Sequence, residues 1–241
     1  MDLGKEIVVD LYRHGLIRTW LRDRPEGWTL VSGLWSPFYV QLRTLPSYPR
    51  LLTKIGRYLG QVIGRECRAD RVLGIAMAGI PIATAVSLQH DLPLCYTRKL
   101  EGVTSLEELQ RAAGIYGEHA LVEGAMEDGD EFVAIDDLVT RFDSKLVTLE
   151  QLAMEAKRRN LEVECGHVAV IIDREQGAAR RAAETGITLH ALIPFQSRGI
   201  DWLRDSFSRH EYEVIRDYLA DSAAYQQEEE RRRRIAEFSP E

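Results

Sequence analysis

Two adjacent carboxylates, Asp136 and Asp137, follow a short apolar run in residues 132–145, FVAIDDLVTRFDSK. Carboxylate oxygens accept hydrogen bonds from vicinal hydroxyl groups and bind hard cations such as Mg²⁺. Thr140 and Ser144 follow where a helix is expected to begin, and helix N-termini bind anions through backbone N–H groups. The pattern predicts a site for a phosphorylated sugar. A helix cap with neighbouring surface charge is the alternative interpretation.

The same stretch lacks the glycines that usually follow the threonine of a phosphate loop, and Arg141, Phe142 and Asp143 occupy those positions. Glycine permits positive φ and a close approach of the backbone to phosphate. We therefore expect Phe142 and Asp143 to obstruct the loop, and an ionised Asp143 to repel phosphate. Arg141 offsets this repulsion if it folds over the anion. Alternatively, Asp143 caps the helix from Ser144 and points away.

Short, almost wholly apolar runs alternate with helical patterns through the middle of the chain. This alternation is typical of a parallel sheet covered by helices on both faces. We predict an α/β fold with a doubly wound sheet of about five parallel strands, right-handed crossovers and the flavodoxin-like strand count. The expected strands are 72–76, 94–97, 132–135, 168–172 and 187–193, and the expected helices are 51–67, 82–89 and 144–159.

The two ends of the chain and one long connection do not follow this alternation. The first 20 residues fit an amphipathic helix that Gly15 can end. Residues 101–131 form a long connection containing the helix-like SLEELQRAA, and connections of this length are often lids. In the tail, residues 208–241, glutamates stand four residues before arginines, and this spacing predicts one long polar helix. We expect a domain over 1–207, with a small N-terminal hood of about 1–45, and a C-terminal helical extension over 208–241.

Composition excludes several classes of function. The 241 residues carry a net charge of −7, which argues against a general nucleic-acid binder. Cys67, Cys95 and Cys165 are widely spaced and predict buried free thiols rather than a disulfide or zinc site. There is no run long enough for a membrane span, and the start is too charged for a signal peptide. We expect a cytoplasmic protein with no membrane or nucleic-acid partner.

Five segments resemble type I phosphoribosyltransferases and, among them, the orotate phosphoribosyltransferases. They occur in family order, and three of them directly follow predicted parallel strands, whose carboxyl ends share one rim. The segments are TLVSGLWSPFYVQLR (29–43), GIAMAGIPIATAVSL (74–88), CYTRK (95–99) with YGEHALVEG (116–124), FVAIDDLVTRFDSK (132–145) and IIDREQG (171–177).

The resemblance implies an enzyme that converts orotate and phosphoribosyl diphosphate to orotidine monophosphate and diphosphate with Mg²⁺. It implies a homodimer, because the loop that carries Arg98 reaches a neighbouring subunit's site in this family. By the same resemblance, Asp136 and Asp137 hold the ribose hydroxyls, with an indirect role at Mg²⁺, and Lys99 serves its own site. The remaining implied substrate contacts are Tyr39 and Arg174 at the base, Ala78 and Gly79 in the diphosphate loop, Tyr116 at the end of the mobile loop, and Thr140, Arg141, Asp143 and Ser144 around the 5′-phosphate.

Three cations typical of the family are missing from this sequence. Val31 and Ala78 occupy positions where lysines are usual. A further lysine is usual shortly before the position of Tyr116, and this sequence has AAGI there. Only Arg111 and His119 offer replacement charges in that loop. Two alternatives therefore stay open, a phosphoribosyltransferase for another base and a non-catalytic protein that binds a nucleotide or phosphoribosyl diphosphate.

Overall fold

The computed structural model describes residues 3–30, 32–103, 105–116 and 119–238. The chain divides into two compact units. Unit 1 combines both ends of the chain, Met1–Leu45 and Phe195–Glu241, and unit 2 is the continuous segment Pro46–Pro194.

Unit 2 is built on a six-stranded sheet in the order β10-β9-β8-β5-β6-β7. All neighbours pair in parallel except β7, which pairs antiparallel with β6 at one edge. The five parallel strands follow the flavodoxin-like order, so the predicted α/β doubly wound sheet is confirmed. The strands are β5 (Arg71–Gly74), β6 (Leu94–Thr97), β7 (Val122–Glu123), β8 (Glu131–Val139), β9 (Glu164–Asp173) and β10 (Thr188–Pro194).

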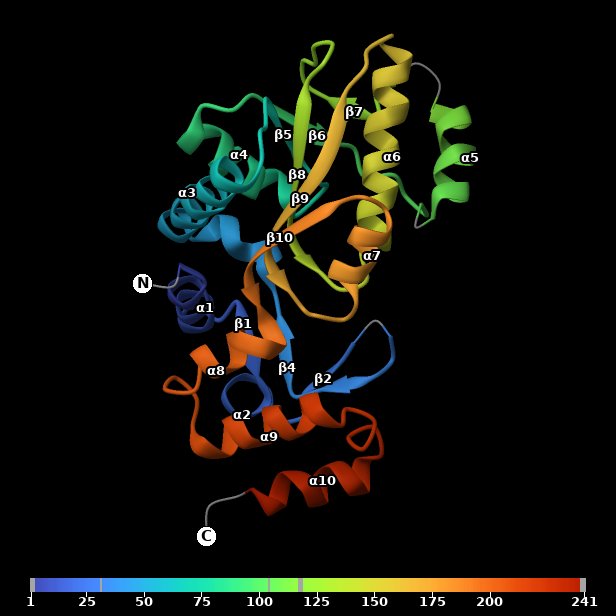
Figure 1. Cartoon of the computed structure of the whole chain (residues 1–241). Coiled ribbons are helices and arrows are strands. Elements are labelled where there is room, and N and C mark those ends of the chain that lie inside the picture. The colour runs from blue at the N-terminus through green and yellow to red at the C-terminus, as the bar shows by residue number, and fades with distance from the viewer. Residues whose placement is uncertain (1–2, 31, 104, 117–118, 239–241) are drawn as a thin grey trace. The chain divides into compact units, whose positions relative to one another are not determined.

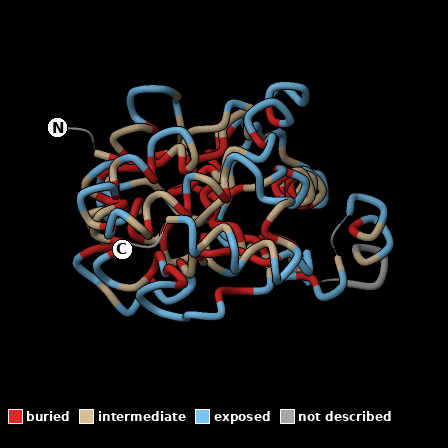
Figure 2. The backbone as a smooth tube through the Cα atoms, turned by 90° about the horizontal axis from the view of Figure 1, so that it is seen from below, coloured by how far each residue is buried: buried red, intermediate tan, exposed pale blue. Residues whose placement is uncertain are grey.

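Helices cover both faces of this sheet (Figure 1). One face carries α3 (Pro49–Glu66) and α4 (Gly79–His90), and the other carries α6 (Asp143–Arg158) and α7 (Ala178–Glu184). Helix α5 (Leu106–Tyr116), within the long connection, packs on α6. Strand β5 is buried throughout, and β8 is buried from Phe132 to Asp136, which explains their apolar runs. Figure 2 shows that buried residues gather in the interior of the backbone trace.

Two strands are longer than their apolar runs suggest. Strand β8 continues through Asp136 and Asp137 to Val139 because β9 still pairs with it there, Leu138 opposite Ile172. Strand β9 begins at Glu164, four residues before the expected start. The two acids therefore lie within a strand, and the predicted strand end at residue 135 is wrong.

Unit 1 is held together by aromatic side chains from both ends of the chain. Trp35 stacks on Tyr225 with ring centroids 5.8 Å apart, and Tyr218 donates a hydrogen bond from its hydroxyl to the carbonyl of Trp35 at 3.1 Å. The elements are α1 (Leu3–Arg13), β1 (Ile17–Thr19), α2 (Trp20–Asp23), β2 (Trp28–Thr29), β3 (Trp35–Ser36), β4 (Phe38–Val40), a 3-10 turn at Leu42–Ser47, a π-turn at Phe195–Gly199, α8 (Ile200–Trp202), α9 (Arg209–Ala220) and α10 (Glu228–Glu237).

The prediction of one long helix over residues 208–241 is wrong. Helix α9 starts at a capping box formed by Ser208 and Glu211, and a separate helix, α10, follows after a turn. The turn brings Tyr225 into the aromatic cluster, where it is fully buried. Among the described residues, no helix is both long and apolar enough to cross a membrane.

Candidate active site

The predicted ribose-binding acids lie at the point where the sheet order reverses. From β5 the chain moves first to β6 on one side and later to β8 on the other, which makes the β5–β8 boundary a topological switch point. Strand β5 pairs with β8 only as far as Gly74 opposite Ile135. Asp136 and Asp137 follow immediately and have no strand beside them on that side. They therefore lie at the switch point, where open α/β sheets bind ligands, and Asp136 lines a pocket there.

Asp136 is buried, and its charge is matched by a lysine from the following helix. Lys145 Nζ donates to Asp136 Oδ2 at 2.6 Å and to the carbonyl of Leu138 at 3.0 Å. The other carboxylate oxygen, Oδ1, accepts from the backbone N–H of Asp137 at 2.8 Å. Both Lys145 and Asp136 are largely removed from water. This buried ion pair fixes the end of β8 to the start of α6.

Asp137 is held in a different electrostatic environment from its neighbour. Burial, followed by the negative charge of Asp136, raises the pKa of Asp137 to about 7. The N–H of Leu138, which donates to Asp137 Oδ1 at 2.7 Å, and the charge of Lys145 act in the opposite direction. The two acids therefore share one nearby cation, and their second ionisation falls close to neutral pH.

Phe142 does not obstruct the cradle in the way its type suggests. Its backbone has φ 77° and ψ −13°, the left-handed conformation that glycine adopts most readily. Its ring is 1% exposed and belongs to the hydrophobic cluster that includes Val139, Leu152 and Ala182. The expectation that Phe142 prevents positive φ is wrong, because burial of the ring stabilises the strained backbone.

The residues around Phe142 form the first turn of α6. The carbonyl of Phe142 accepts from the backbone N–H groups of Lys145 and Leu146, so Phe142 is the N-cap residue. The alternative that Asp143 caps the helix from Ser144 is wrong, because α6 begins at Asp143 and no side chain caps it. Asp143 is exposed and lies 3.8 Å from Arg181. Thr140 is partly buried, and Arg141 and Ser144 are exposed.

The predicted diphosphate loop joins the end of β5 to the start of α4. The Oγ of Thr97 accepts from the N–H of Ala76 at 3.0 Å, and the loop leads through Ala78 into α4 at Gly79. A Cβ on Gly79 would stand 2.2 Å from the carbonyl oxygen of Ile135. Glycine is therefore required at this position for α4 to approach the end of β8.

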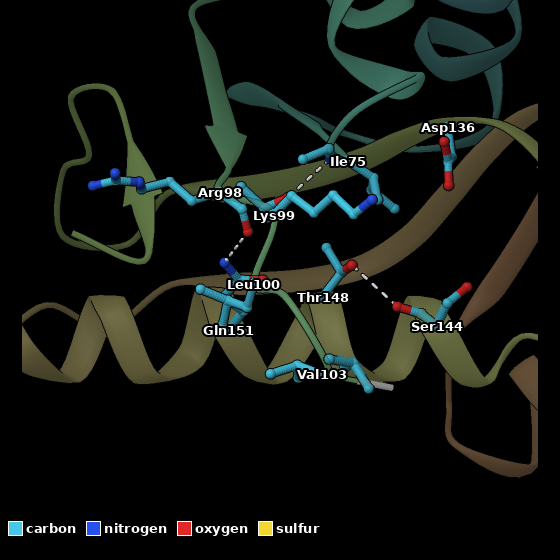
Figure 3. Close-up of a pocket in the computed structure, with 12 residues that line it drawn as sticks. Ile75, Arg98, Lys99, Leu100, Val103, Asp136, Ser144, Thr148 and Gln151 are labelled. Carbon is cyan, nitrogen blue, oxygen red and sulfur yellow. Dashed lines mark hydrogen bonds between the residues drawn. The ribbon is translucent and has the colours of Figure 1, made fainter. Parts of the chain in front are cut away.

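A pocket of about 270 Å³ lies between this loop, the end of β6 and α6. It brings together Lys99, Asp136 and Ser144, and Figure 3 shows Lys99 extended into it in the direction of Asp136. The Arg98 side chain points away from Lys99 and lies 3.6 Å from Glu123. Gln151 donates to the carbonyls of Arg98, at 2.9 Å, and of Leu121, at 2.7 Å. The two ends of the long connection are thereby fixed to α6.

The remaining predicted residues fall in different places. Arg174 directly follows β9 on the same rim, and its backbone N–H donates to the carbonyl of Val139 at 3.0 Å. Tyr39 belongs to unit 1, on β4, where it stacks with Trp28. Val31 and the side chain of Tyr116 lie outside the described residues.

Sequence reasoning missed Lys145 as a member of the site. Its position carried a signal, because Lys145, Thr148, Leu152 and Ala156 are buried residues of α6 at helical spacing. A lysine on the buried face of a helix requires a counter-charge. Asp136 and Asp137 of the same motif are candidates for this counter-charge, and the structure shows that Asp136 provides it.

Comparison with known proteins gives one family. The chain is 30% identical over 213 residues to the orotate phosphoribosyltransferase of Dinoroseobacter shibae, covering 84% of each protein. A solved UMP synthase of Leishmania donovani superposes with a TM-score of 0.70 and 26% identity over 90% of this chain and 42% of that one. The orotate phosphoribosyltransferase of Aeropyrum pernix gives a TM-score of 0.55 and 25% identity over 77% of this chain and 92% of that one. No family model matches the chain.

The sheet order, the acids at the switch point and the loop before α6 define a type I phosphoribosyltransferase fold. With the similarity to curated relatives, the chain belongs to the orotate phosphoribosyltransferase family.

Proposed function

We propose that the protein transfers a phosphoribosyl group from phosphoribosyl diphosphate to orotate, forming orotidine monophosphate and diphosphate in pyrimidine nucleotide synthesis. Family membership supports this activity. The observation that carries the proposal is the conformation of Phe142, whose backbone takes the glycine-like form while its ring is buried. The loop at residues 140–144 can therefore present N–H groups to a 5′-phosphate although it lacks glycine.

The chemistry requires stabilised charge and positioning more than a strong acid or base. A bond forms between orotate and ribose C1 as the bond from C1 to the diphosphate oxygen breaks, and C1 becomes cation-like between the two events. Asp136 and Asp137 would accept hydrogen bonds from the ribose 2′- and 3′-hydroxyls. Lys99, extended into the pocket, would neutralise charge that develops on the leaving diphosphate.

Other residues would hold the two ends of the substrates. Thr140 and Ser144 would add hydroxyl donors to the 5′-phosphate, with Arg141 over the anion. Arg174 follows β9 on the same rim, and its planar guanidinium suits the carboxylate of orotate. The side chain of Arg98 points away from Lys99, which supports a role in the site of a partner in a homodimer.

The acids also fit a magnesium ion. Both oxygens of Asp136 accept hydrogen bonds from the protein, which leaves Asp137 as the carboxylate better able to contact the ion or its water. Mg²⁺ is commonly bound by one or two carboxylates together with substrate phosphates. When bound, it would reduce the charge of the diphosphate.

The described cysteines are all free, which accords with a cytoplasmic location.

The direct test is orotidine monophosphate formation from orotate and phosphoribosyl diphosphate with Mg²⁺. The Asp137→Asn variant should lose roughly 100-fold or more in kcat/KM, the size expected when a reacting group is misplaced. Asp91→Asn is a matched control, because Asp91 is a left-handed C-cap of α4 and asparagine is well suited to that conformation. Absence of turnover in the unmodified protein, together with tight nucleotide binding, would instead favour the non-catalytic alternative.

A further inference from the structure

Three potential metal ligands from distant parts of unit 2 lie together on one face of the sheet. Cys67 directly follows α3, His167 is on β9 and His190 is on β10. Each offers one ligand atom, and these atoms lie within 4.8 Å of one another. The Nδ1 of His167 is 3.0 Å from the Nε2 of His190, and the two rings stack with centroids 5.2 Å apart.

The topology of the sheet brings these residues together. His167 pairs with Thr188 in the parallel register, so His190, two residues further along β10, lies on the same face as His167. Helix α3 packs against β9 and β10 on this face and ends at Glu66, which places Cys67 over the two histidines. All three residues are partly exposed, so an ion from solvent can reach them.

The set of donor atoms is one that zinc prefers. Thiolate sulfur and imidazole nitrogen are the usual ligands of Zn²⁺, and two histidines with one cysteine leave a fourth tetrahedral position for water. Two nitrogens on one tetrahedral zinc lie about 3.3 Å apart, given Zn–N bonds of about 2.0–2.1 Å. The observed 3.0 Å is close to this separation. The Cys67 thiol donates to the carbonyl of Ile63 at 3.4 Å, and zinc binding would replace this hydrogen bond.

Nearby negative charge favours a cation here. Glu66 acts electrostatically on both Cys67 and His190, and Glu131 acts on Cys67. We propose that Cys67, His167 and His190 form a zinc-binding site that joins the end of α3 to strands β9 and β10. The sequence predicts no zinc site because the three cysteines are widely spaced along the chain. The proposed site instead combines Cys67 with His167, 100 positions later in the sequence, and with His190.

The proposed zinc site is separate from the ribose-binding acids. His167 pairs with Val133 of β8, whereas Asp136 is three residues further along that strand. At about 3.3 Å per residue, this separation is roughly 10 Å along the sheet. The proposed zinc site is therefore distinct from the Mg²⁺ site of the proposed reaction.

The competing interpretation is a metal-free histidine pair, in which one ring nitrogen donates to the other. Calorimetric titration of Zn²⁺ into the chelator-treated protein distinguishes the two. We expect one Zn²⁺ per chain in the unmodified protein. Loss of a direct ligand in Cys67→Ala or His190→Ala should weaken binding by more than the roughly 10–100-fold typical of outer-shell partners.

Cys165→Ala is the matched control. Cys165 lies two residues before His167 on the same strand, and its thiol is 3.6 Å from the carbonyl of His167, but its sulfur is not among the three converging atoms. This variant should bind zinc as the unmodified protein does. Circular dichroism of each metal-free variant shows whether it is folded before titration.

Two further measurements make the assignment specific. Co²⁺ in place of Zn²⁺ should give a sulfur-to-cobalt charge-transfer band that Cys67→Ser abolishes. Zinc at a hundredfold excess over Kd should raise the Tm of the unmodified protein by roughly 5–10 °C and leave that of Cys67→Ala unchanged. Failure of the folded unmodified protein to bind one Zn²⁺, or binding that depends on Cys165 and not on Cys67, would overturn the proposal.

Discussion

Lys145 determines the electrostatics of the candidate site. It is a buried cation that contacts Asp136 at 2.6 Å and lies close enough to lower the pKa of Asp137. Asp136 and Asp137 lie in β8, just beyond the end of the neighbouring strand β5. Without Lys145, no described lysine or arginine would be bonded to these two carboxylates. Lys145 therefore supplies local positive charge to both acids.

We predict that Lys145→Met destabilises the fold by about 3–5 kcal/mol, because it leaves the buried Asp136 carboxylate uncompensated. Urea unfolding measures the change. Lys157→Met, an exposed position on the same helix, should change stability by less than about 0.5 kcal/mol. Equal effects of the two substitutions would mean that the ion pair contributes nothing beyond the helix itself.

The raised pKa of Asp137 predicts a pH dependence of stability. Between the usual value of 3.8 and about 7, the folded state binds more protons than the unfolded state, so stability falls as pH rises through this window. Asp137→Asn removes the titration, and at pH 8 it should be more stable than the unmodified protein by up to about 4 kcal/mol, at about 1.4 kcal/mol per pKa unit. Unfolding at pH 4 and pH 8 measures the difference, which should nearly vanish at pH 4.

At the scale of elements, the start of α6 combines a strained backbone with a buried ring. Replacing Phe142 by alanine should cost about 3–5 kcal/mol through the lost burial. Glycine loses the same ring but relieves the left-handed strain of about 1–2 kcal/mol. Phe142→Gly should therefore be more stable than Phe142→Ala, which reverses the order seen within helices. Chemical denaturation of the two variants side by side decides the point.

The close contact between α4 and β8 is the second feature that fixes the position of the candidate site. Gly79→Ala places a methyl group against the carbonyl of Ile135 and should displace the diphosphate loop, lowering both stability and phosphoribosyl transfer. Gly64→Ala in α3 is the control, because a Cβ there meets nothing within 4 Å. That substitution should stabilise the protein by up to about 1 kcal/mol. Kinetics and thermal unfolding of both variants separate a local clash from a general intolerance of alanine.

The elements that sequence could predict are those whose pattern reports directly on burial. The parallel strands contain apolar runs because both faces of the sheet are covered, and the alternation of these runs with helices indicated a doubly wound parallel sheet. The end of β8 was missed because Asp136 and Asp137 interrupt the apolar run while pairing with β9 continues. The backbone conformation of Phe142 is set by tertiary burial of its ring, and residue type alone argued against it.

At the scale of the whole molecule, unit 1 depends on both ends of the chain. Helix α9 buries Val214, Ile215 and Tyr218, and Tyr225 after it stacks on Trp35. We predict that truncation after Phe207 exposes Trp35 and disrupts unit 1, whereas truncation after Gln227 removes only α10, which has no buried residues, and is tolerated. Tryptophan fluorescence and near-ultraviolet circular dichroism compare the two. Native spectra after the longer deletion would contradict this prediction and support the expectation that residues 208–241 are a separate extension.

The chain leaves unit 1 at Leu45, completes all of unit 2, and returns at Phe195. During synthesis, unit 2 therefore emerges whole while unit 1 still lacks residues 195–241. At roughly 5–20 residues per second, a few seconds pass before that segment is made. During this interval the hood, which contains Trp20, Trp28 and Trp35, lacks the C-terminal segment that completes unit 1. We expect its uncovered apolar surface to be the part of the nascent protein that a chaperone binds.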